Sequence, residues 1–312
     1  MLAYPSLTLT ATSCSSKLAE KSMTLDQALT VAAAELAGDE QLRDTATRDA
    51  ELLLLHTLQI PRVTLFAHSD TELTPSQSEA YEKIIARRLR HEPIQYITRQ
   101  QEFYGLNFNV TPAVLIPRPE TEHLIEAVLN LLPKNQPLTI ADIGTGSGAI
   151  AIALAIHLPK AEITALDIST EALAIATLNA GEHQVNGSIK FLQSDLLSVL
   201  TAETETFDAI VSNPPYVAES DRNSLHPQVR DHEPALALFA GKTGLDIYRR
   251  LIPQAHKALK PHGLLALEIG HGQQTAITSL LKTWRNISFV NDLQQVPRVA
   301  LARKPANSVP IR

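Results

Sequence analysis

Four consecutive residues, Asn213-Pro214-Pro215-Tyr216, carry the groups that methyl transfer to a planar nitrogen requires. The lone pair of a planar NH2 group is delocalised, so its hydrogens must be held while the lone pair faces the methyl carbon. The Asn213 side-chain carbonyl and the Pro214 backbone carbonyl offer two acceptors for those hydrogens, and Pro215 stiffens the chain that carries them. Tyr216 can stack on a flat acceptor group. The motif predicts N-methylation by positioning, which supplies ~7 to 11 kcal/mol in well-oriented reactions, and requires no obvious general base.

An Asn-Pro pair also occurs in ordinary surface turns, so the elements around the motif decide its interpretation. Short apolar runs alternate with helical patterns in the second half of the chain. This alternation predicts an α/β fold with a doubly wound sheet. In such sheets ligands bind at the carboxyl ends of the strands, and the motif follows the fourth expected strand. We place the strands at about 138–143, 163–167, 189–193, 207–212 and 263–269.

A glycine-rich loop, Asp142-Ile143-Gly144-Thr145-Gly146-Ser147-Gly148, follows the first of these strands, and Asp167 ends the second. Glycines permit close approach of a ligand, and a carboxylate about 20 residues further on can accept hydrogen bonds from both hydroxyls of an adenosine ribose. The alternative is a tight strand-to-helix connection without a ligand. NAD and S-adenosylmethionine both use such loops. The Gly-x-Gly-x-Gly spacing after Asp142 favours S-adenosylmethionine.

Other polar residues leave two interpretations open. Asp195 resembles the acid that binds the adenine amino group in methyltransferases, and the alternative, which is nearly as well supported, is a helix N-cap. Glu268 ends the fifth strand and suits either a buried structural hydrogen bond or a substrate contact. Residues 87–90, Arg-Arg-Leu-Arg, are expected to form a solvated helix face, the alternative being a docking patch for an acidic partner or RNA. None of the 11 His has metal-ligand spacing, so no metal is expected.

The first half of the chain predicts a small helical bundle over residues 24–91. Thr24 with Gln27, and Thr74 with Pro75 and Gln77, are typical helix starts. Residues 92–118 are expected to link the domains through a hairpin, because Ile94, Tyr96 and the apolar residues of 103–110 are spaced as in short strands. A methyltransferase domain is expected over 119–312. Residues 1–23 are expected to be a disordered leader.

The composition excludes several classes of protein. The 312 residues carry a net charge of -6 and only 4% aromatic residues, which argues against a general polyanion binder. The single cysteine, Cys14, cannot form an intrachain disulfide. The longest apolar stretch, residues 149–156, is far below the ~20 residues that span a bilayer. We therefore expect a cytoplasmic monomer without membrane association or direct nucleic-acid binding.

The chain resembles the HemK-type protein-(glutamine-N5) methyltransferases, also called the PrmC family, which modify peptide chain release factors. Besides the Asn-Pro-Pro-Tyr motif, the resemblance rests on residues 92–97, Glu-Pro-Ile-Gln-Tyr-Ile, and 116–122, Ile-Pro-Arg-Pro-Glu-Thr-Glu. Further matches are residues 233–238, Glu-Pro-Ala-Leu-Ala-Leu, and 244–249, Gly-Leu-Asp-Ile-Tyr-Arg, with Leu-Glu-Ile-Gly at 267–270. These segments distinguish the family from nucleic-acid methyltransferases.

The resemblance implies a seven-stranded Rossmann-like class I methyltransferase sheet behind an N-terminal helical domain that recognises the substrate. The substrate is the glutamine of a Gly-Gly-Gln motif in a release factor, S-adenosylmethionine is the methyl donor, and S-adenosylhomocysteine is the product. The glutamine would lie against Asn213, Pro214, Pro215 and Tyr216. The cofactor would lie against Gly144, Thr145, Gly146, Ser147, Gly148, Asp167, Asp195, Leu196 and Asn213.

Two departures from the family are visible: Arg99 and Gln295 stand where relatives commonly have Gly, which puts the local backbone shape in doubt. Two other functions are compatible with parts of the sequence. An amino-methyltransferase acting on RNA or DNA could use the same acceptors for an exocyclic base amine. A module that binds S-adenosylmethionine without transferring methyl is the other, but it has no need of the intact Asn-Pro-Pro-Tyr motif.

Overall fold

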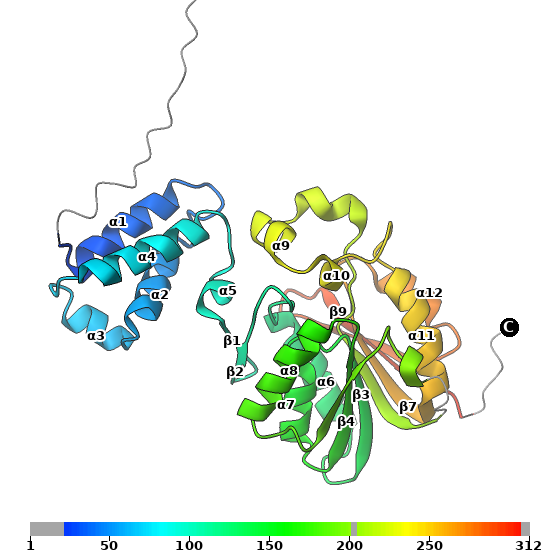
Figure 1. Ribbon diagram of the computed structural model, residues 1–312. Helices are drawn as coiled ribbons and strands as arrows, with labels where there is room; N and C mark the ends of the chain where they lie inside the picture. Colours follow the sequence, from blue (N-terminus) through cyan, green and yellow to red (C-terminus); the bar gives the residue numbers. More distant parts are fainter. Residues whose placement is uncertain (1–21, 201–204, 307–312) are drawn as a thin grey trace, which may run out of the picture. The chain divides into compact units, whose positions relative to one another are not determined.

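The computed structural model describes residues 22–200 and 205–306, so Cys14 and nearly all of the predicted leader lie outside the described residues. The chain divides into two compact units, Met1–Thr98 and Arg99–Arg312 (Figure 1). This division falls inside the segment 92–118 that was expected to link two domains.

The first unit is a bundle of short helices. Both predicted helix starts are confirmed, and each is a capping box: the side chains of Thr24 and Thr74 accept the backbone N–H of Gln27 and Gln77, whose side chains accept in return. Leucines at the centre of the bundle are fully buried, and the Tyr81 hydroxyl donates to the Ala50 carbonyl at 2.9 Å. The helices are α1 (Leu25–Ala37), α2 (Ala46–Leu58), α3 (Arg62–Ala67), α4 (Pro75–Arg88) and α5 (Ile94–Thr98).

The arginine run at the end of α4 is not the solvated face that its composition predicts. Arg88 is 4% exposed and its Nε donates to Asp49 on α2 at 2.8 Å. Arg87 pairs with Glu92. The prediction was wrong for Arg88 because a buried carboxylate on a neighbouring helix compensates its charge.

The expected strand at Ile94 and Tyr96 is also wrong, because residues 94–98 form α5. Pro93 precedes this helix, and its carbonyl accepts the backbone N–H groups of both Tyr96 and Ile97. Tyr96 is fully buried, and Ile97 belongs to the core of the bundle. Burial of these side chains outweighs the preference of aromatic and β-branched residues for strands.

The second unit begins with the hairpin β1 (Gln100–Phe103) and β2 (Leu106–Asn109). The 3-10 turn η2 (Pro119–Thr121) and helix α6 (Glu122–Leu131) then lead into a seven-stranded sheet of order β5-β4-β3-β6-β7-β9-β8. The strands from β5 to β7 run parallel, and β9 runs antiparallel to both of its neighbours, β7 and β8. The strands are β3 (Leu138–Ile143), β4 (Ala161–Asp167), β5 (Ile189–Gln193), β6 (Phe207–Ser212), β7 (Leu259–Glu268), β8 (Arg285–Asn291) and β9 (Pro297–Arg303).

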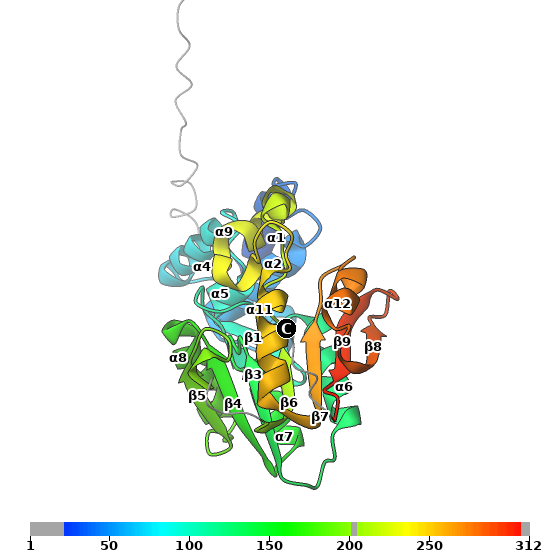
Figure 2. The ribbon, with the colours of Figure 1, turned by 90° about the vertical axis from the view of Figure 1, so that its right-hand side faces the viewer.

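Helices cover both faces of this sheet (Figures 1 and 2). One core cluster joins the strands to α6, α7 (Ala149–His157) and α8 (Thr170–Glu182). The other joins them to α11 (Asp246–Ala258) and α12 (Gln274–Leu280). The connection from β6 to α11 contains η4 (Glu219–Ser224), α9 (Pro227–His232) and α10 (Ala235–Leu238), and η3 (Ser198–Leu200) follows β5. The predicted α/β class, with a doubly wound methyltransferase sheet, is confirmed.

The strand order reverses at β3, which has β4 on one side and β6 on the other. The last residues of β3 and β6, Ile143 and Ser212, are register partners. The Ser212 hydroxyl also donates to the Ile143 carbonyl at 2.6 Å. The glycine loop and the Asn-Pro-Pro-Tyr motif therefore leave the sheet side by side, at the reversal where doubly wound sheets bind ligands.

Gly148 connects this loop to α7. Its φ is +83°, and an added Cβ would lie 3.0 Å from Ile152 Cδ1 and 3.2 Å from Ala176 Cβ. We expect Gly148→Ala to lower the free energy of unfolding by about 1–3 kcal/mol, because a strained backbone and a close contact coincide. Gly181→Ala is the matched control: a Cβ there meets no atom within 4 Å, so a helical alanine should stabilise by about 0.5–1 kcal/mol. Denaturant unfolding followed by circular dichroism checks both values, and equal effects of the two variants would contradict the packing role of Gly148.

Candidate active site

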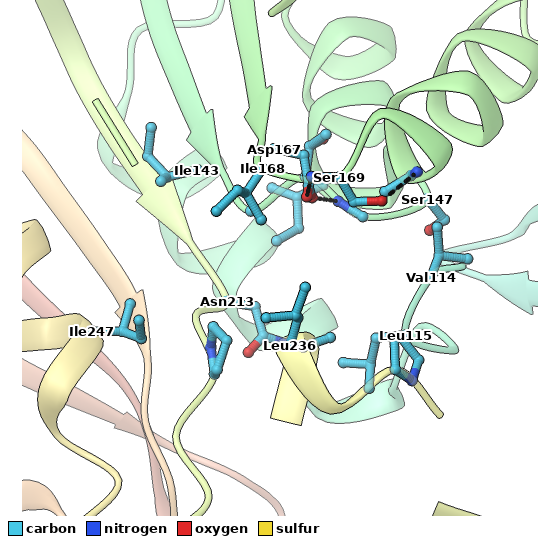
Figure 3. A pocket seen from close by; sticks show the side chains of 18 of the residues that line it. Val114, Leu115, Ile143, Ser147, Asp167, Ile168, Ser169, Asn213, Leu236 and Ile247 are labelled. Carbon is cyan, nitrogen blue, oxygen red and sulfur yellow. Dashed lines mark hydrogen bonds between the residues drawn. The ribbon is translucent and has the colours of Figure 1, made fainter. Parts of the chain in front are cut away.

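A cavity of about 440 Å3 lies at the carboxyl ends of β3, β4, β5 and β6 (Figure 3). The glycine loop, Asp167 and the motif after β6 contribute to its lining, as sequence analysis predicts for a ligand site. Apolar side chains from two other segments complete the wall, namely Val114 and Leu115 before η2, and Leu236 on α10.

The glycine loop presents its backbone to the cavity. Gly144 and Gly146 have φ values of +72° and +55°, and a Cβ added to either would meet no atom within 4 Å. Both glycines line the cavity with Thr145 and Ser147, whereas Gly148 is not among the lining residues. The loop therefore leaves open space where side chains would otherwise project, which fits close approach of a ligand.

Asp167 lines the cavity in a fixed orientation. Its Oδ2 accepts the Gly146 N–H at 2.9 Å, and its Oδ1 accepts the Ser169 N–H at 3.0 Å (Figure 3). Each carboxylate oxygen can accept more than one hydrogen bond. Asp167 therefore keeps acceptor capacity for two hydroxyl groups of a ligand.

Asp195 and Leu196 line the cavity at the end of β5. The alternative that Asp195 caps a helix is wrong: the Val199 N–H at the following η3 bonds to Ser194 Oγ at 3.1 Å. The Asp195 carboxylate instead pairs with Arg250 on α11, which also lines the cavity. Leu196 has a φ of +55° and contributes apolar surface beside this ion pair.

Asp142 lies behind the loop and is fully buried. The Thr145 hydroxyl donates to its Oδ2 at 2.7 Å. Burial raises the pKa of Asp142 to about 7, against the opposing effect of the hydrogen bond from Thr145. The carboxyl group thus ties the loop to the end of β3 without facing the cavity.

Two of the four residues of the Asn-Pro-Pro-Tyr motif line the cavity, and the other two do not. Asn213 and Pro215 line the cavity. Pro214 is buried, and no donor among the described residues bonds to its carbonyl oxygen. Tyr216 is not among the lining residues: its main-chain carbonyl accepts from Gln273 at 3.0 Å and its hydroxyl donates to Glu268 at 3.3 Å. Contact of Pro214 and Tyr216 with a substrate stays a prediction.

Glu268 is 2% exposed and, like Tyr216, is absent from the lining. Its Oε2 accepts from the Thr121 hydroxyl at 2.6 Å, and Thr121 Oγ1 in turn accepts the Asn213 amide at 3.0 Å. Burial raises the pKa of Glu268 to about 7. Of its two interpretations, the geometry favours the buried hydrogen bond.

The segment 116–122 contributes residues to the site whose individual roles the sequence pattern does not predict. Thr121 and Arg118 line the cavity, and Arg118 pairs with Glu233, which is buried and is not among the lining residues. Asn179 was also missed; it is fully buried on α8 and donates to the Ser147 carbonyl at 2.9 Å. No local pattern predicts these roles, because the bonding partners lie far away in sequence.

Two family models match the chain. The PrmC N-terminal domain matches residues 27–98, and the Methyltransferase small domain matches residues 122–229. A release factor glutamine methyltransferase of Koribacter versatilis is 48% identical over 258 residues, which cover 83% of this chain and 91% of that protein. One of Moorella thermoacetica is 43% identical, over 90% of this chain and 98% of that protein. The chain belongs to the release factor glutamine methyltransferase family.

A solved methyltransferase structure has the same fold. The hMettl16 catalytic domain, in complex with the MAT2A 3'UTR hairpin 6, superposes with a TM-score of 0.52 at 15% identity. The match covers 71% of this chain and 82% of that chain. Among the described residues no helix is long and apolar enough to cross a membrane.

Asp167 is the site residue whose role is most directly measurable by binding. We expect Asp167→Ala to weaken S-adenosylmethionine affinity by about 10-fold to 100-fold, because a charged hydrogen-bond partner contributes roughly 1.5–3 kcal/mol. Glu162→Ala, at the exposed opposite end of β4, removes the same charge and should leave affinity unchanged. Isothermal titration calorimetry checks both, and unchanged affinity in Asp167→Ala would mean that the carboxylate is structural.

Proposed function

We propose that this protein transfers a methyl group from S-adenosylmethionine to the side-chain amide nitrogen of the glutamine in a Gly-Gly-Gln motif of a peptide chain release factor. The single observation that carries the proposal is the position of Asn213. It lies on the cavity wall immediately after β6, beside the glycine loop, with the amide nitrogen of its own side chain bonded to Thr121.

The residues around the cavity fit the methyl donor. Gly144 and Gly146 leave open space for its close approach, Asp167 has acceptor capacity for the ribose hydroxyls, and Leu196 offers apolar contact to the adenine. When bound, S-adenosylmethionine supplies a methyl group activated by its sulfonium, and S-adenosylhomocysteine is left after transfer. The protein must then hold the acceptor in place.

The group that receives the methyl is a primary amide. Its NH2 group needs two hydrogen-bond acceptors to fix its orientation. Asn213 Oδ1 and the Pro214 carbonyl oxygen supply these acceptors, and neither accepts a hydrogen bond from another described residue. Pro214 and Pro215 restrict the backbone that carries both oxygens. Orientation of the amide lone pair toward the methyl group follows from this fixed geometry.

The other candidate substrate is an exocyclic amine of a nucleic-acid base, which the same two acceptors could hold. The net charge of -6 and the close relatives named for release factor glutamine favour the protein substrate. Incubation with labelled S-adenosylmethionine and either purified release factor or RNA, followed by mass spectrometry, tests the proposal. Label on the Gly-Gly-Gln glutamine supports it; label on RNA alone, or on neither, contradicts it.

We expect Asn213→Ala to reduce methyl transfer on the order of 100-fold to 1000-fold, by analogy with the loss of one oxyanion-hole donor. The fold should be retained, since Asn213 lies in a loop. The exposed Asn186 provides the control variant Asn186→Ala, which should transfer methyl at the wild-type rate. Initial rates at saturating S-adenosylmethionine measure the effect. A turnover of Asn213→Ala within threefold of wild type would contradict the role of Asn213 in holding the substrate amide.

The first unit carries none of the cavity residues, and we propose that it recognises the release factor. A glutamine side chain offers too little surface to single out one residue, whereas protein complexes commonly bury ~1,200–2,000 Å². A soluble, folded fragment that starts at Arg99 should bind S-adenosylmethionine with near-normal affinity but methylate intact release factor far more slowly than the full chain. Calorimetry and initial rates measure the two effects. A fragment with the full-length rate would exclude recognition by the bundle, and one without cofactor binding would make the bundle part of the catalytic core.

A further inference from the structure

A chain of hydrogen bonds leads from the cavity wall into the core of the sheet domain. Asn213 Nδ2 donates to Thr121 Oγ1 at 3.0 Å, and Thr121 Oγ1 donates to Glu268 Oε2 at 2.6 Å. The Tyr216 hydroxyl lies 3.3 Å from the other carboxylate oxygen. Thr121 is 4% exposed and Glu268 is 2% exposed, so water has little access to these bonds.

The Glu268 carboxylate determines which group donates in each of these hydrogen bonds. A hydroxyl has one proton to donate, and an ionised carboxylate can only accept. Because Thr121 donates its one hydroxyl proton to Glu268, the Thr121 oxygen can only accept a hydrogen bond from Asn213. Asn213 must therefore turn its NH2 group toward Thr121, which leaves its carbonyl oxygen on the other side. Among the described residues nothing donates to that oxygen.

We propose that Thr121 and Glu268 are positioning residues, which hold the Asn213 side chain in the one amide orientation that offers its carbonyl oxygen to the substrate amide. This inference rests on the proposed function. With the Asn213 amide reversed, an NH2 group would face the NH2 group of the substrate, and two donors cannot bond to each other. Neither Thr121 nor Glu268 needs to touch the reacting atoms for this role.

Charged groups on several elements face Glu268. Arg298 on β9 favours its ionised form, while Glu120 in η2 opposes it. The Tyr248 hydroxyl on α11 donates to the main-chain carbonyl of Glu268 at 2.8 Å. Burial has the largest effect on the carboxyl pKa, and the hydrogen bonds from Thr121 and Tyr216 act against it. The ionised form directs the hydrogen bonds as described above.

The test is a double-mutant cycle on Thr121 and Asn213, with methyl transfer to purified release factor as the assay. Thr121→Val keeps the shape of the side chain but removes the hydroxyl, and we expect kcat to fall by about 10-fold to 100-fold with little change in S-adenosylmethionine affinity. Thr121→Ser should restore most of the rate. In the Asn213→Ala background, Thr121→Val should have no further effect, because Thr121 acts only through the Asn213 side chain.

The cycle separates positioning from a general structural role. A destabilised fold would lower activity in both backgrounds, so an equal loss in wild type and in Asn213→Ala overturns the proposal, as does a Thr121→Val rate within twofold of wild type. Thr278→Val, on the exposed face of α12, is the control for loss of a hydroxyl and should be fully active. An inactive wild type contradicts the proposed function, whereas an active wild type with unaffected Thr121→Val contradicts only the positioning role.

The pH profile gives a second readout. Protonation of Glu268 would free the Thr121 proton to turn toward Asn213, so kcat of the wild type should decline as pH falls below about 7. Glu268→Gln should lower kcat and remove that decline. A Glu268→Gln variant with the wild-type rate and the wild-type pH profile would overturn the role of Glu268.

Discussion

The register of β3 against β6 is the constraint on which the site depends. Ile143 and Ser212 are paired at the ends of these strands, and the Ser212 hydroxyl bonds to the Ile143 carbonyl. A slip of one residue would turn every side chain of one strand to the opposite face. This pairing sets the positions of the glycine loop and of Asn213 relative to each other, because Gly144 directly follows Ile143 and Asn213 directly follows Ser212.

Two carboxyl groups are buried directly behind the functional loops, Asp142 under the glycine loop and Glu268 under Asn213. Burial raises both pKa values to about 7, above their unfolded values near 4. Between these values the folded chain binds more protons than the unfolded chain, so their ionisation lowers stability as pH rises through that window. Both carboxyl groups accept a hydrogen bond from a threonine that lines the cavity, and perturbed pKa values are often found at functional sites.

Backbone strain is also found at the two positions where the family resemblance leads one to expect glycine. Arg99 and Gln295 have φ values of +65° and +62°, in the left-handed region that glycine adopts without a steric penalty. Such residues cost of order 1–3 kcal/mol each, and they persist where the surroundings determine the conformation. Arg99 accepts the Val110 N–H at the base of the hairpin, and the Gln295 N–H closes a turn on the Asp292 carbonyl. Neither residue lines the cavity, so the departures alter local backbone energy and leave the site unchanged.

The sequence alone determined the features that depend on neighbours along the chain. Both capping boxes, the parallel strands, the glycine loop and the Asn-Pro-Pro-Tyr motif after β6 could be predicted, because periodicity, turn residues and strand-end loops are local patterns. Tertiary structure decided the rest. Residues 94–98 became a helix through burial of Tyr96, and Arg88 became buried through its pairing with Asp49. The bond from Thr121 to Glu268 joins residues 147 positions apart, and no local pattern encodes a partner at that separation.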